Sequence, residues 1–272
     1  MTDRYAAFDR LKFDRPAPGV LRLTLSNPGK ANAITPRTHH QLEQVWAVID
    51  ADPETRATII TGEGKAFCAG GALDDMPDEA GALDRNQQFS LDFGNATRLV
   101  RNLIDARKPI VSAINGAAVG AGLALALLAD ISIASKTAKL LDGHVRIGVT
   151  AGDHAAIVWP LLCGMAKAKY YLLTNRTMTG EEAERNNLVS LAVDPEALEA
   201  TSIEIASELA AAAPTAVRMT KHVLNHWLRQ NAAIFELSTA FEIVNFFGAE
   251  ATEAMAAMTG KRPANFTTDV LF

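Results

Sequence analysis

Apolar and polar positions alternate in short blocks along the first two thirds of the chain. Residues 20–25 alternate in the manner of a half-buried strand and end at turn-forming residues. A helix is predicted next, with Thr35 as its N-cap and Pro36 as its first residue, and its apolar positions recur at helical spacing until Pro53. Residues 56–61 predict another strand. This alternation of strand and helix indicates an α/β fold with parallel strands joined by crossover helices.

The later part of the chain changes character after Pro195. Before it, the pattern predicts a loop in the acidic segment 72–84, a helix at 89–104, a strand at 131–134, a loop at 136–150, helices near 152–174 and 180–187, and a strand at 188–193. After it we find only alanine-rich helical patterns, broken near Pro214, Gly248 and Gly260. We therefore expect an α/β core in residues 1–200 and an all-helical region in residues 201–272. The apolar face of that region packs either on the chain's own core or on another subunit; its aromatic residues are Phe235, Phe241, Phe246 and Phe247.

Residues 109–130 form the most informative segment, because an apolar strand leads through a glycine-rich turn into a buried helix. The first amides of a helix have no acceptor within it and carry the positive end of the helix dipole, so they stabilise an oxygen that gains negative charge. The segment is uncharged over residues 110–129, which is long enough to suggest a membrane span. Polar and glycine residues interrupt that run and favour strand, turn and helix instead: Ser112, Asn115, Gly116, Gly120 and Gly122.

A second glycine-rich turn, at residues 64–71, also follows a predicted strand. Ligands of sheets with crossover helices bind at the carboxyl ends of the strands. One backbone amide from each turn could therefore meet at a single carbonyl oxygen and stabilise it as it gains charge. The two turns together indicate enolate or tetrahedral chemistry.

Composition narrows the class of protein further. With 272 residues, 49% of them apolar, the chain can bury a large core, and a net charge of −5 argues against nucleic acid as a partner. The two cysteines, Cys68 and Cys163, have no metal-type spacing and favour a reducing compartment. The charged residues near Met1 do not fit a secretory signal. We expect a cytoplasmic protein without a membrane segment and without a bound metal.

Two motifs carry a family resemblance. The stretches Phe67-Cys68-Ala69-Gly70-Gly71-Ala72-Leu73 and Asn115-Gly116-Ala117-Ala118-Val119-Gly120-Ala121-Gly122, the latter closing at Asp130, resemble the two signatures of the enoyl-CoA hydratase/isomerase (crotonase) family. Further segments follow in family order at similar distances: Asn27-Pro28, Asn32-Ala33, Leu172-Leu173-Thr174, Glu181-Glu182-Ala183, Leu188-Val189 and residues 261–266. The resemblance covers nearly the whole chain.

The resemblance implies a spiral of ββα turns, with a carboxy-terminal helical region that builds homotrimers or dimers of trimers. It implies an acyl-CoA thioester as substrate, with coenzyme A as part of that substrate and no other cofactor. The oxyanion amides correspond to Gly71 and Ala121. The resemblance also assigns residues to coenzyme A binding, the last of them acting from a neighbouring subunit: Lys30, Ala31, Ala33, Ala69 and Lys261.

The chain departs from the family's hydratases at the two glutamates that handle water, whose positions align with Ala124 and His144. A positioned acid or base contributes about 10²–10⁴-fold to a rate, so different proton chemistry is needed. We predict that His144 pairs with Asp153, because an imidazole oriented by a carboxylate is a competent base for water near neutral pH. Asp142 either orients His144 or only forms the turn.

The segment 141–154 also resembles that of the family's β-diketone hydrolases, which cleave a carbon–carbon bond by a retro-Claisen route. Glu242 falls near another acidic residue of that subgroup, whereas a further histidine of the subgroup aligns with Gly122. Hydration of an enoyl-CoA and hydrolysis of a 1,3-dicarbonyl therefore both fit.

Other interpretations remain open at this stage. Asp153 lies near the nucleophilic aspartate of the family's aromatic dehalogenases, or it simply caps a helix that starts near His154. Double-bond isomerisation would need a single base, for which Asp74, Asp75 and Asp153 are candidates. A non-catalytic acyl-CoA-binding homologue is a further alternative. His154 is predicted to be a helix-start residue, and Trp159 to belong to the core.

Overall fold

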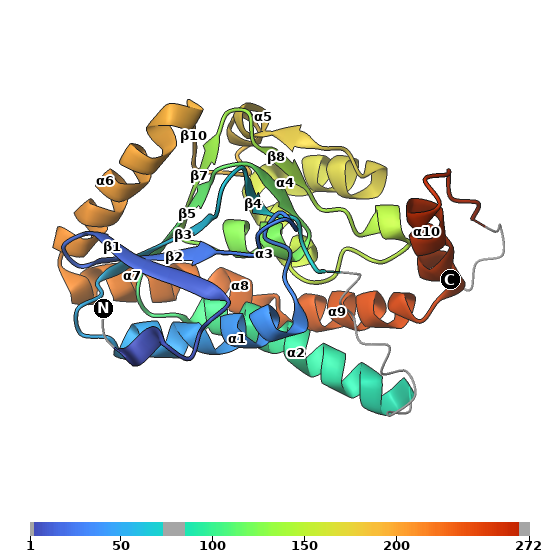
Figure 1. The fold of residues 1–272 in the computed structure, drawn as a ribbon, viewed down its shortest axis with the longest axis horizontal. Coiled ribbons are helices and arrows are strands. Elements are labelled where there is room, and N and C mark those ends of the chain that lie inside the picture. Colours follow the sequence, from blue (N-terminus) through green and yellow to red (C-terminus); the bar gives the residue numbers. More distant parts are fainter. Residues whose placement is uncertain (1–2, 73–84, 267–272) are drawn as a thin grey trace.

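Two sheets form the centre of the molecule (Figure 1). The structure is a computed structural model and describes residues 3–72 and 85–266. The larger sheet has six strands in the spatial order β1 (Leu11–Ala17), β2 (Val20–Leu25), β3 (Ala57–Gly62), β5 (Ile110–Ile114), β7 (Ile131–Ser135) and β10 (Leu191–Val193). The strands from β2 to β10 pair in parallel, and β1 joins the edge as an antiparallel hairpin with β2. The predicted α/β class with parallel strands is confirmed.

The smaller sheet contains β4 (Ala66–Cys68), β6 (Ala117–Val119), β8 (Lys139–Leu141) and β9 (Met178–Thr179). Its first three strands are parallel, and β9 is antiparallel to β8. Two expectations were wrong here. Residues 136–150 are not only loop, because they contain β8, and the glycine-rich turn does not lead straight into a helix, because β6 intervenes. Strands of three residues are too short to produce a readable alternation of polar and apolar positions.

Helices surround the sheets and make up the carboxy-terminal part. They are α1 (Pro36–Ala51), α2 (Arg85–Asp105), α3 (Ala121–Leu127), α4 (Ala155–Thr174), α5 (Gly180–Arg185), α6 (Leu198–Ala211), α7 (Pro214–Leu224), α8 (His226–Gln230), α9 (Ala232–Phe246) and α10 (Ala249–Thr259). Short 3₁₀ turns lie at Asp3–Tyr5, Val145–Ile147 and Pro195–Ala197. The predicted start of α1 is confirmed, because the Thr35 side chain accepts a hydrogen bond from the N–H of Thr38 and Pro36 is the first helical residue. The predicted loop at 72–84 lies outside the described residues, apart from Ala72.

Two apolar clusters cover the two faces of the larger sheet. The main cluster includes Trp46, Phe67 and Trp159, so the prediction that Trp159 belongs to the core is confirmed. The second cluster joins Val20 and other sheet residues to the apolar face of α6. Since α6 begins at Leu198, the predicted boundary between residues 200 and 201 falls inside a helix that packs on the sheet, and the two-domain division stays a prediction.

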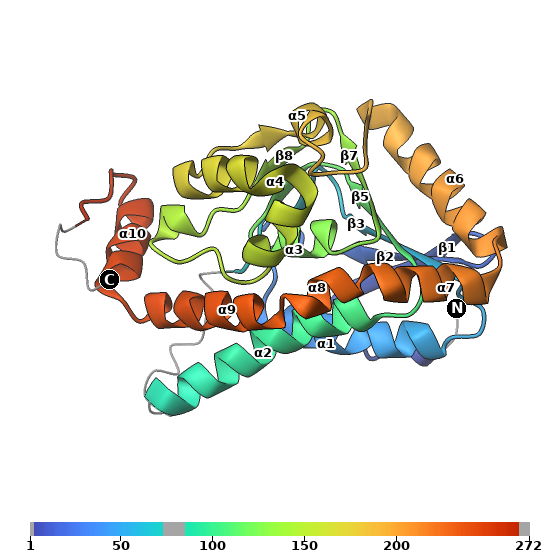
Figure 2. The same cartoon turned by 180° about the vertical axis from the view of Figure 1, so that it is seen from behind.

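Helices α7, α8 and α9 run in one row along the side of the molecule that also carries α2 (Figure 2). Helix α9 packs against both α2 and α4. Of its predicted aromatic residues Phe235 is buried, whereas Phe241 is 40% exposed. Within the described ranges, no single helix is long and apolar enough to cross a membrane. Helices α9 and α10 meet that test only as a pair, which bends by 62°.

Candidate active site

The carboxyl ends of β4, β6 and β8 meet at one edge of the smaller sheet. Cys68 at the end of β4 pairs with Ala118 of β6, and Val119 of β6 pairs with Leu141 of β8. The turn after each strand carries predicted site residues: Gly70 and Gly71 after β4, Gly120 and Ala121 after β6, and Asp142 to His144 after β8. The sheet therefore brings together three segments that are far apart in the sequence.

Close packing between the first two turns requires glycine. A Cβ atom on Gly70 would lie 2.9 Å from the carbonyl oxygen of Val119, and one on Gly122 would lie 2.6 Å from the carbonyl oxygen of Cys68. A side chain at either position would push the turns apart. The histidine that the β-diketone hydrolases carry at the position of Gly122 would require this packing to change.

The amides assigned to the oxyanion hole lie on these two turns. Ile34 forms a parallel bridge with Gly71 that uses the oxygen of Gly70 and the N–H of Ala72, so the N–H of Gly71 is directed to the opposite side. Ala121 is the first residue of α3, and its N–H has no acceptor within the helix. The convergence of both amides on one oxygen stays a prediction.

The segment predicted to bind coenzyme A runs beside the Gly71 turn. The N–H of Ala69 donates to the oxygen of Ala31 at 3.0 Å, and Ala31 and Asn32 adopt left-handed backbone conformations. The Asn32 side chain anchors this turn by donating to two carbonyl oxygens at 2.9 Å. Lys30, Ala31 and Ala69 are exposed, and Ala33 is buried. Lys261 lies exposed after α10; its predicted role concerns a neighbouring subunit and stays a prediction.

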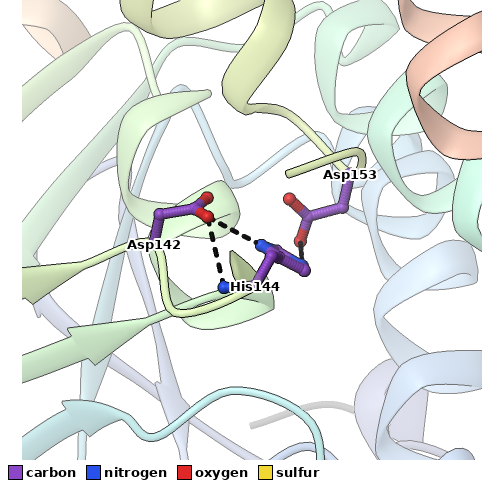
Figure 3. Close-up of side chains that lie close together, drawn as sticks. All are labelled: Asp142, His144 and Asp153. Atoms are coloured by element: carbon purple, nitrogen blue, oxygen red, sulfur yellow. Dashed lines mark hydrogen bonds and ion pairs between the residues drawn. The ribbon is translucent and has the colours of Figure 1, made fainter. Parts of the chain in front are cut away.

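His144 lies among three carboxylates, two of which appear with it in Figure 3. Its Nδ1 is 3.0 Å from Oδ1 of Asp142. On the other side of the ring, Nε2 is 3.5 Å from Oε1 of Glu242 and 3.9 Å from Oδ2 of Asp153. All four residues are more than nine-tenths buried. The structure thus brings together four residues that the sequence singled out, and it makes Asp142, not Asp153, the nearest partner of His144.

The imidazole lies directly beside the turn that leads into α3. A Cβ atom on Gly120 would be 3.9 Å from Cε1 of His144, and Gly120 immediately precedes Ala121. Ala124, at the other aligned glutamate position, is buried within α3 and offers no proton-transfer group. The described residues next to this turn supply the acid–base groups of the buried cluster and the thiol of Cys68, whose pKa burial raises to about 12.

Electrostatics in the cluster favour a charged imidazole. Burial opposes the charge on His144, but Asp153 and Asp142 outweigh it and hold the pKa of His144 well above its usual range. Burial also opposes the charge on Asp153, yet His154 and His144 lower its pKa to about 2. For Glu242 burial prevails, and its pKa is raised. Near neutral pH the cluster therefore contains an imidazolium, an ionised Asp153, and a glutamate that takes up a proton more readily than usual.

Helix α9 holds the loop that carries Asp153. The hydroxyl of Ser238 donates to the oxygen of Gly152 at 2.9 Å, and Oδ1 of Asn245 accepts from the N–H of Thr150 at 2.9 Å. The same helix supplies Glu242. The carboxy-terminal region is therefore part of the site.

Comparison with known proteins identifies the family. Residues 15–269 match the family model described as enoyl-CoA hydratase/isomerase. The chain belongs to this family.

Individual members support the assignment. The chain is 32% identical over 248 residues to the short-chain-enoyl-CoA hydratase of Clostridium acetobutylicum, covering 89% of this chain and 92% of that protein. It is 29% identical to the 1,2-epoxyphenylacetyl-CoA isomerase of Escherichia coli, covering 92% and 95% of the two chains. The crystal structure of an enoyl-CoA hydratase/isomerase from Pseudoalteromonas atlantica superposes with a TM-score of 0.84 at 27% identity, over 95% of this chain and all of that one. The expected crotonase fold is confirmed.

Two of the open alternatives for individual residues can now be decided. The N-cap of α4 is His154, so the interpretation of Asp153 as its cap was wrong and that of His154 as a helix-start residue is confirmed. Asp142 does not only form the turn, because it accepts hydrogen bonds from both the ring and the backbone of His144. Its role in orienting His144 for a reaction stays a prediction. Asp74 and Asp75, candidate bases for isomerisation, lie outside the described residues.

The site contains contacts that the sequence did not reveal. His154 is bonded to Asp153, and residues of α9 support the loop before α4. A signal for the second contact was present, because four polar residues recur at helical spacing in the largely apolar helix α9: Ser238, Thr239, Glu242 and Asn245. One ligand atom from each of Asp142, His144 and Asp153 lies within 4.8 Å of the others, a spacing that a divalent ion could bridge.

Proposed function

We propose that this family member adds water to the double bond of an enoyl-CoA thioester. The amides of Gly71 and Ala121 hold the carbonyl oxygen, and His144, Asp153 and Glu242 handle the water. The observation that carries the proposal is the 3.9 Å separation between Cε1 of His144 and a Cβ position on Gly120. It supports a proton-transfer group immediately beside the proposed oxyanion amides.

The proposed reaction moves two protons. As the water oxygen bonds to Cβ of the enoyl group, a water proton passes to Glu242, whose raised pKa makes it a better acceptor than Asp153. The electrons of the double bond form an enolate, whose oxygen the two amides stabilise; one such donor is worth about 3–4 kcal/mol. Nε2 of His144 then donates a proton to Cα. Glu242 returns its proton to the imidazole across the 3.5 Å gap, which restores the site.

Asp142 and Asp153 have supporting roles in this proposal. Asp142 fixes the imidazole through Nδ1, so that Nε2 faces the water. Asp153 keeps the imidazole charged and accepts a hydrogen bond from the water through Oδ2. Lys30, Ala31, Ala33 and Ala69 bind coenzyme A, which their position beside the Gly71 turn supports.

We also propose a homotrimer or a dimer of trimers, in which Lys261 reaches the nucleotide of a coenzyme A bound to a neighbouring subunit. Apolar side chains on the carboxy-terminal helices support an interface there: Met219, Val223, Trp227 and Leu237 are each more than half exposed. Light scattering coupled to size exclusion measures the mass of the assembly. A monomer at micromolar concentration would refute this part of the proposal.

The test uses crotonyl-CoA. Hydration removes the conjugated double bond, so its ultraviolet absorbance falls and mass spectrometry detects a product heavier by one water. We expect His144→Gln to lower kcat by at least about 10²-fold. The matched control is His40→Gln, a histidine on the exposed side of α1, which should retain the rate of the unmodified protein. Equal rates in the two variants would remove His144 from the mechanism.

Hydrolysis of a 1,3-dicarbonyl is the second candidate, and the proximity of Glu242 to His144 favours it, because the β-diketone hydrolases carry an acidic residue near that position. In this reaction the activated water attacks one carbonyl, the carbon–carbon bond breaks, and the enolate that leaves is protonated. A cyclic β-diketone incubated in parallel separates the two reactions. Entry of solvent deuterium without net addition of water would indicate isomerisation, and tight coenzyme A binding without turnover would indicate a binding protein.

A further inference from the structure

A second histidine holds Asp153 from the side opposite to His144. Nδ1 of His154 lies 2.5 Å from Oδ1 of Asp153, whereas Oδ2 of Asp153 lies 3.9 Å from Nε2 of His144. The two oxygens of one carboxylate therefore face two different imidazoles. His154 is fully buried, with no exposed surface, so it does not face substrate or solvent. Its side-chain hydrogen bonds join it to Asp153 and to Trp159 of the core.

Trp159 and Asp153 together determine which nitrogen of His154 carries the proton. Nε1 of Trp159 lies 3.4 Å from Nε2 of His154. An indole N–H can only donate a hydrogen bond, so Nε2 of His154 has to be the unprotonated acceptor. The proton of a neutral imidazole is then on Nδ1, where it donates to Asp153. The three residues form a chain of donors that runs from the core to the cluster.

We propose that His154, held by Trp159, is a positioning residue that fixes the Asp153 carboxylate with Oδ2 facing His144 and the reacting water. Without this ring donor the carboxylate keeps the hydrogen bond from the backbone of His154 but loses the partner that fixes the direction of Oδ1. The consequence for catalysis rests on the proposed function, but the tautomer of His154 does not. The role differs from that of Asp142, which orients the other face of the His144 ring.

The charges that surround Asp153 come from three segments. His144 and Asp142 lie on the turn after β8, His154 lies at the start of α4, and Glu242 comes from α9. Burial opposes the charge on Asp153, and hydrogen bonds from the ring and the backbone of His154 are among the interactions that lower its pKa to about 2. Loss of His154 should therefore raise the pKa of Asp153. A protonated Asp153 no longer keeps His144 charged. As the pH is lowered, a variant without His154 should therefore lose activity at a higher pH than the unmodified protein does.

Two substitutions at His154 separate positioning from packing. His154→Asn keeps an N–H donor near the position of Nδ1, and His154→Leu removes it while filling much of the space. With crotonyl-CoA we expect His154→Leu to lower kcat by about 10²-fold with little change in KM. We also expect the midpoint at which activity falls in acid to move to a higher pH. His154→Asn should recover most of the rate and the original midpoint. Equal impairment of the two variants with an unmoved midpoint would overturn the proposal.

A measurement that needs no turnover tests the tautomer. In ¹⁵N spectra of the unmodified protein at neutral pH, we expect His154 to be protonated on Nδ1 and unprotonated on Nε2. A ring protonated on both nitrogens, or on Nε2 alone, would refute the proposal even if crotonyl-CoA is hydrated. Conversely, the expected tautomer in a protein that does not hydrate crotonyl-CoA would leave the proposed function refuted and the arrangement intact.

Two tryptophan substitutions, Trp159→Phe and its control Trp46→Phe, test the role of Trp159. Trp159→Phe removes the indole N–H that faces Nε2, so Nε2 can take up a proton while Nδ1 keeps the one it donates to Asp153. We therefore expect the ¹⁵N spectrum to show His154 protonated on both ring nitrogens, and kcat to fall. The control is Trp46→Phe, because Trp46 is also buried and its Nε1 has no hydrogen-bond partner among the described residues. Trp46→Phe should change the melting temperature through packing alone and leave the His154 spectrum unaltered. The same spectrum in both variants would show that Trp159 does not keep Nε2 unprotonated.

Discussion

Oδ1 of Asp142 accepts two hydrogen bonds from His144, one from its backbone N–H at 3.3 Å and one from Nδ1 at 3.0 Å. Gly143 between them has a φ of +89°, a backbone conformation that glycine adopts without strain. This tight turn folds the imidazole back onto the carboxylate two residues earlier. Nε2 is consequently left facing Asp153 and Glu242, where the proposed reaction takes place.

Asp142→Asn tests this orientation. The substitution preserves the shape of the side chain but removes a negative charge that raises the pKa of His144, and it allows the ring to be held by the wrong tautomer. We expect kcat with crotonyl-CoA to fall by about 10²-fold and the pKa of His144, measured by NMR, to decrease. Asp194→Asn, which disrupts an exposed ion pair with Lys136, serves as control. An unchanged pKa of His144 would contradict the assigned role of Asp142.

The parts of the fold that sequence reasoning predicted depend on local signals. The N-cap at Thr35, the first helical residue at Pro36 and the strand at 20–25 follow from residues within one or two turns of each other, and the structure has all of them. The smaller sheet was missed because strands of three residues, such as β6 and β8, are defined by their pairing and not by their own sequence.

The site was predictable in its chemistry but not in its connections. Asp142, His144 and Asp153 lie within a single polar segment, which drew attention to them as a group. Their partners depend on tertiary packing, because Glu242 lies almost a hundred residues later on α9. Local propensity was also misleading at one point: aspartate is a favoured N-cap, but the carboxylate of Asp153 bonds instead to the ring of the adjacent His154.

Stability should depend on pH through His144. Because its folded pKa is raised above the ordinary value of 6.5, the folded chain binds a proton that the unfolded chain has released. The stabilisation is complete below pH 6.5 and is lost as the pH rises through the folded pKa, with a slope of at most about 1.4 kcal/mol per pH unit. The difference in melting temperature between the unmodified protein and His144→Gln should therefore shrink from pH 6 to pH 9.

Other groups also change the stability between pH 6 and pH 9. The measurement to use is therefore the difference in melting temperature between the unmodified protein and His144→Gln. Glu242, with its raised pKa, also lowers stability as the pH rises, whereas Lys108, whose pKa burial lowers to about 8, acts in the opposite direction. Because Lys108 is present in both proteins, its contribution to the difference in melting temperature largely cancels. The same comparison made with His40→Gln should give a difference that does not vary with pH. A gap that widens toward pH 9 would show that the pKa of His144 is not raised.

Chelation should leave the activity unchanged. The ligand atoms of Asp142, His144 and Asp153 lie close enough to bridge a divalent ion, but a proton already balances their charge, because the carboxylates keep His144 protonated. A metal would have to displace that proton from Nε2. We expect dialysis against EDTA to preserve kcat, and elemental analysis to find less than one ion per chain. A loss of activity that Zn²⁺ or Mg²⁺ restores would establish a metal-dependent mechanism instead.

Gly122→Ala tests the oxyanion site without altering an acid or a base. The added Cβ would lie 2.6 Å from both the carbonyl oxygen and the Cβ of Cys68, so the first turn of α3 has to move away from β4. That movement separates the amide of Ala121 from that of Gly71. Since the loss of one oxyanion donor costs about 10²–10³-fold in kcat, we expect a decrease of this size with crotonyl-CoA.

Gly94→Ala is the matched control, because Gly94 lies within α2 and its added Cβ would meet only the flexible end of Arg98 at 3.0 Å. Melting curves of both variants separate a local displacement from unfolding, and kcat is compared at a temperature where both are folded. If Gly122→Ala matches Gly94→Ala in kcat while remaining folded, the distance between β4 and α3 does not control the reaction. The carbonyl oxygen of the substrate would then have to be held by groups other than the amides of Gly71 and Ala121.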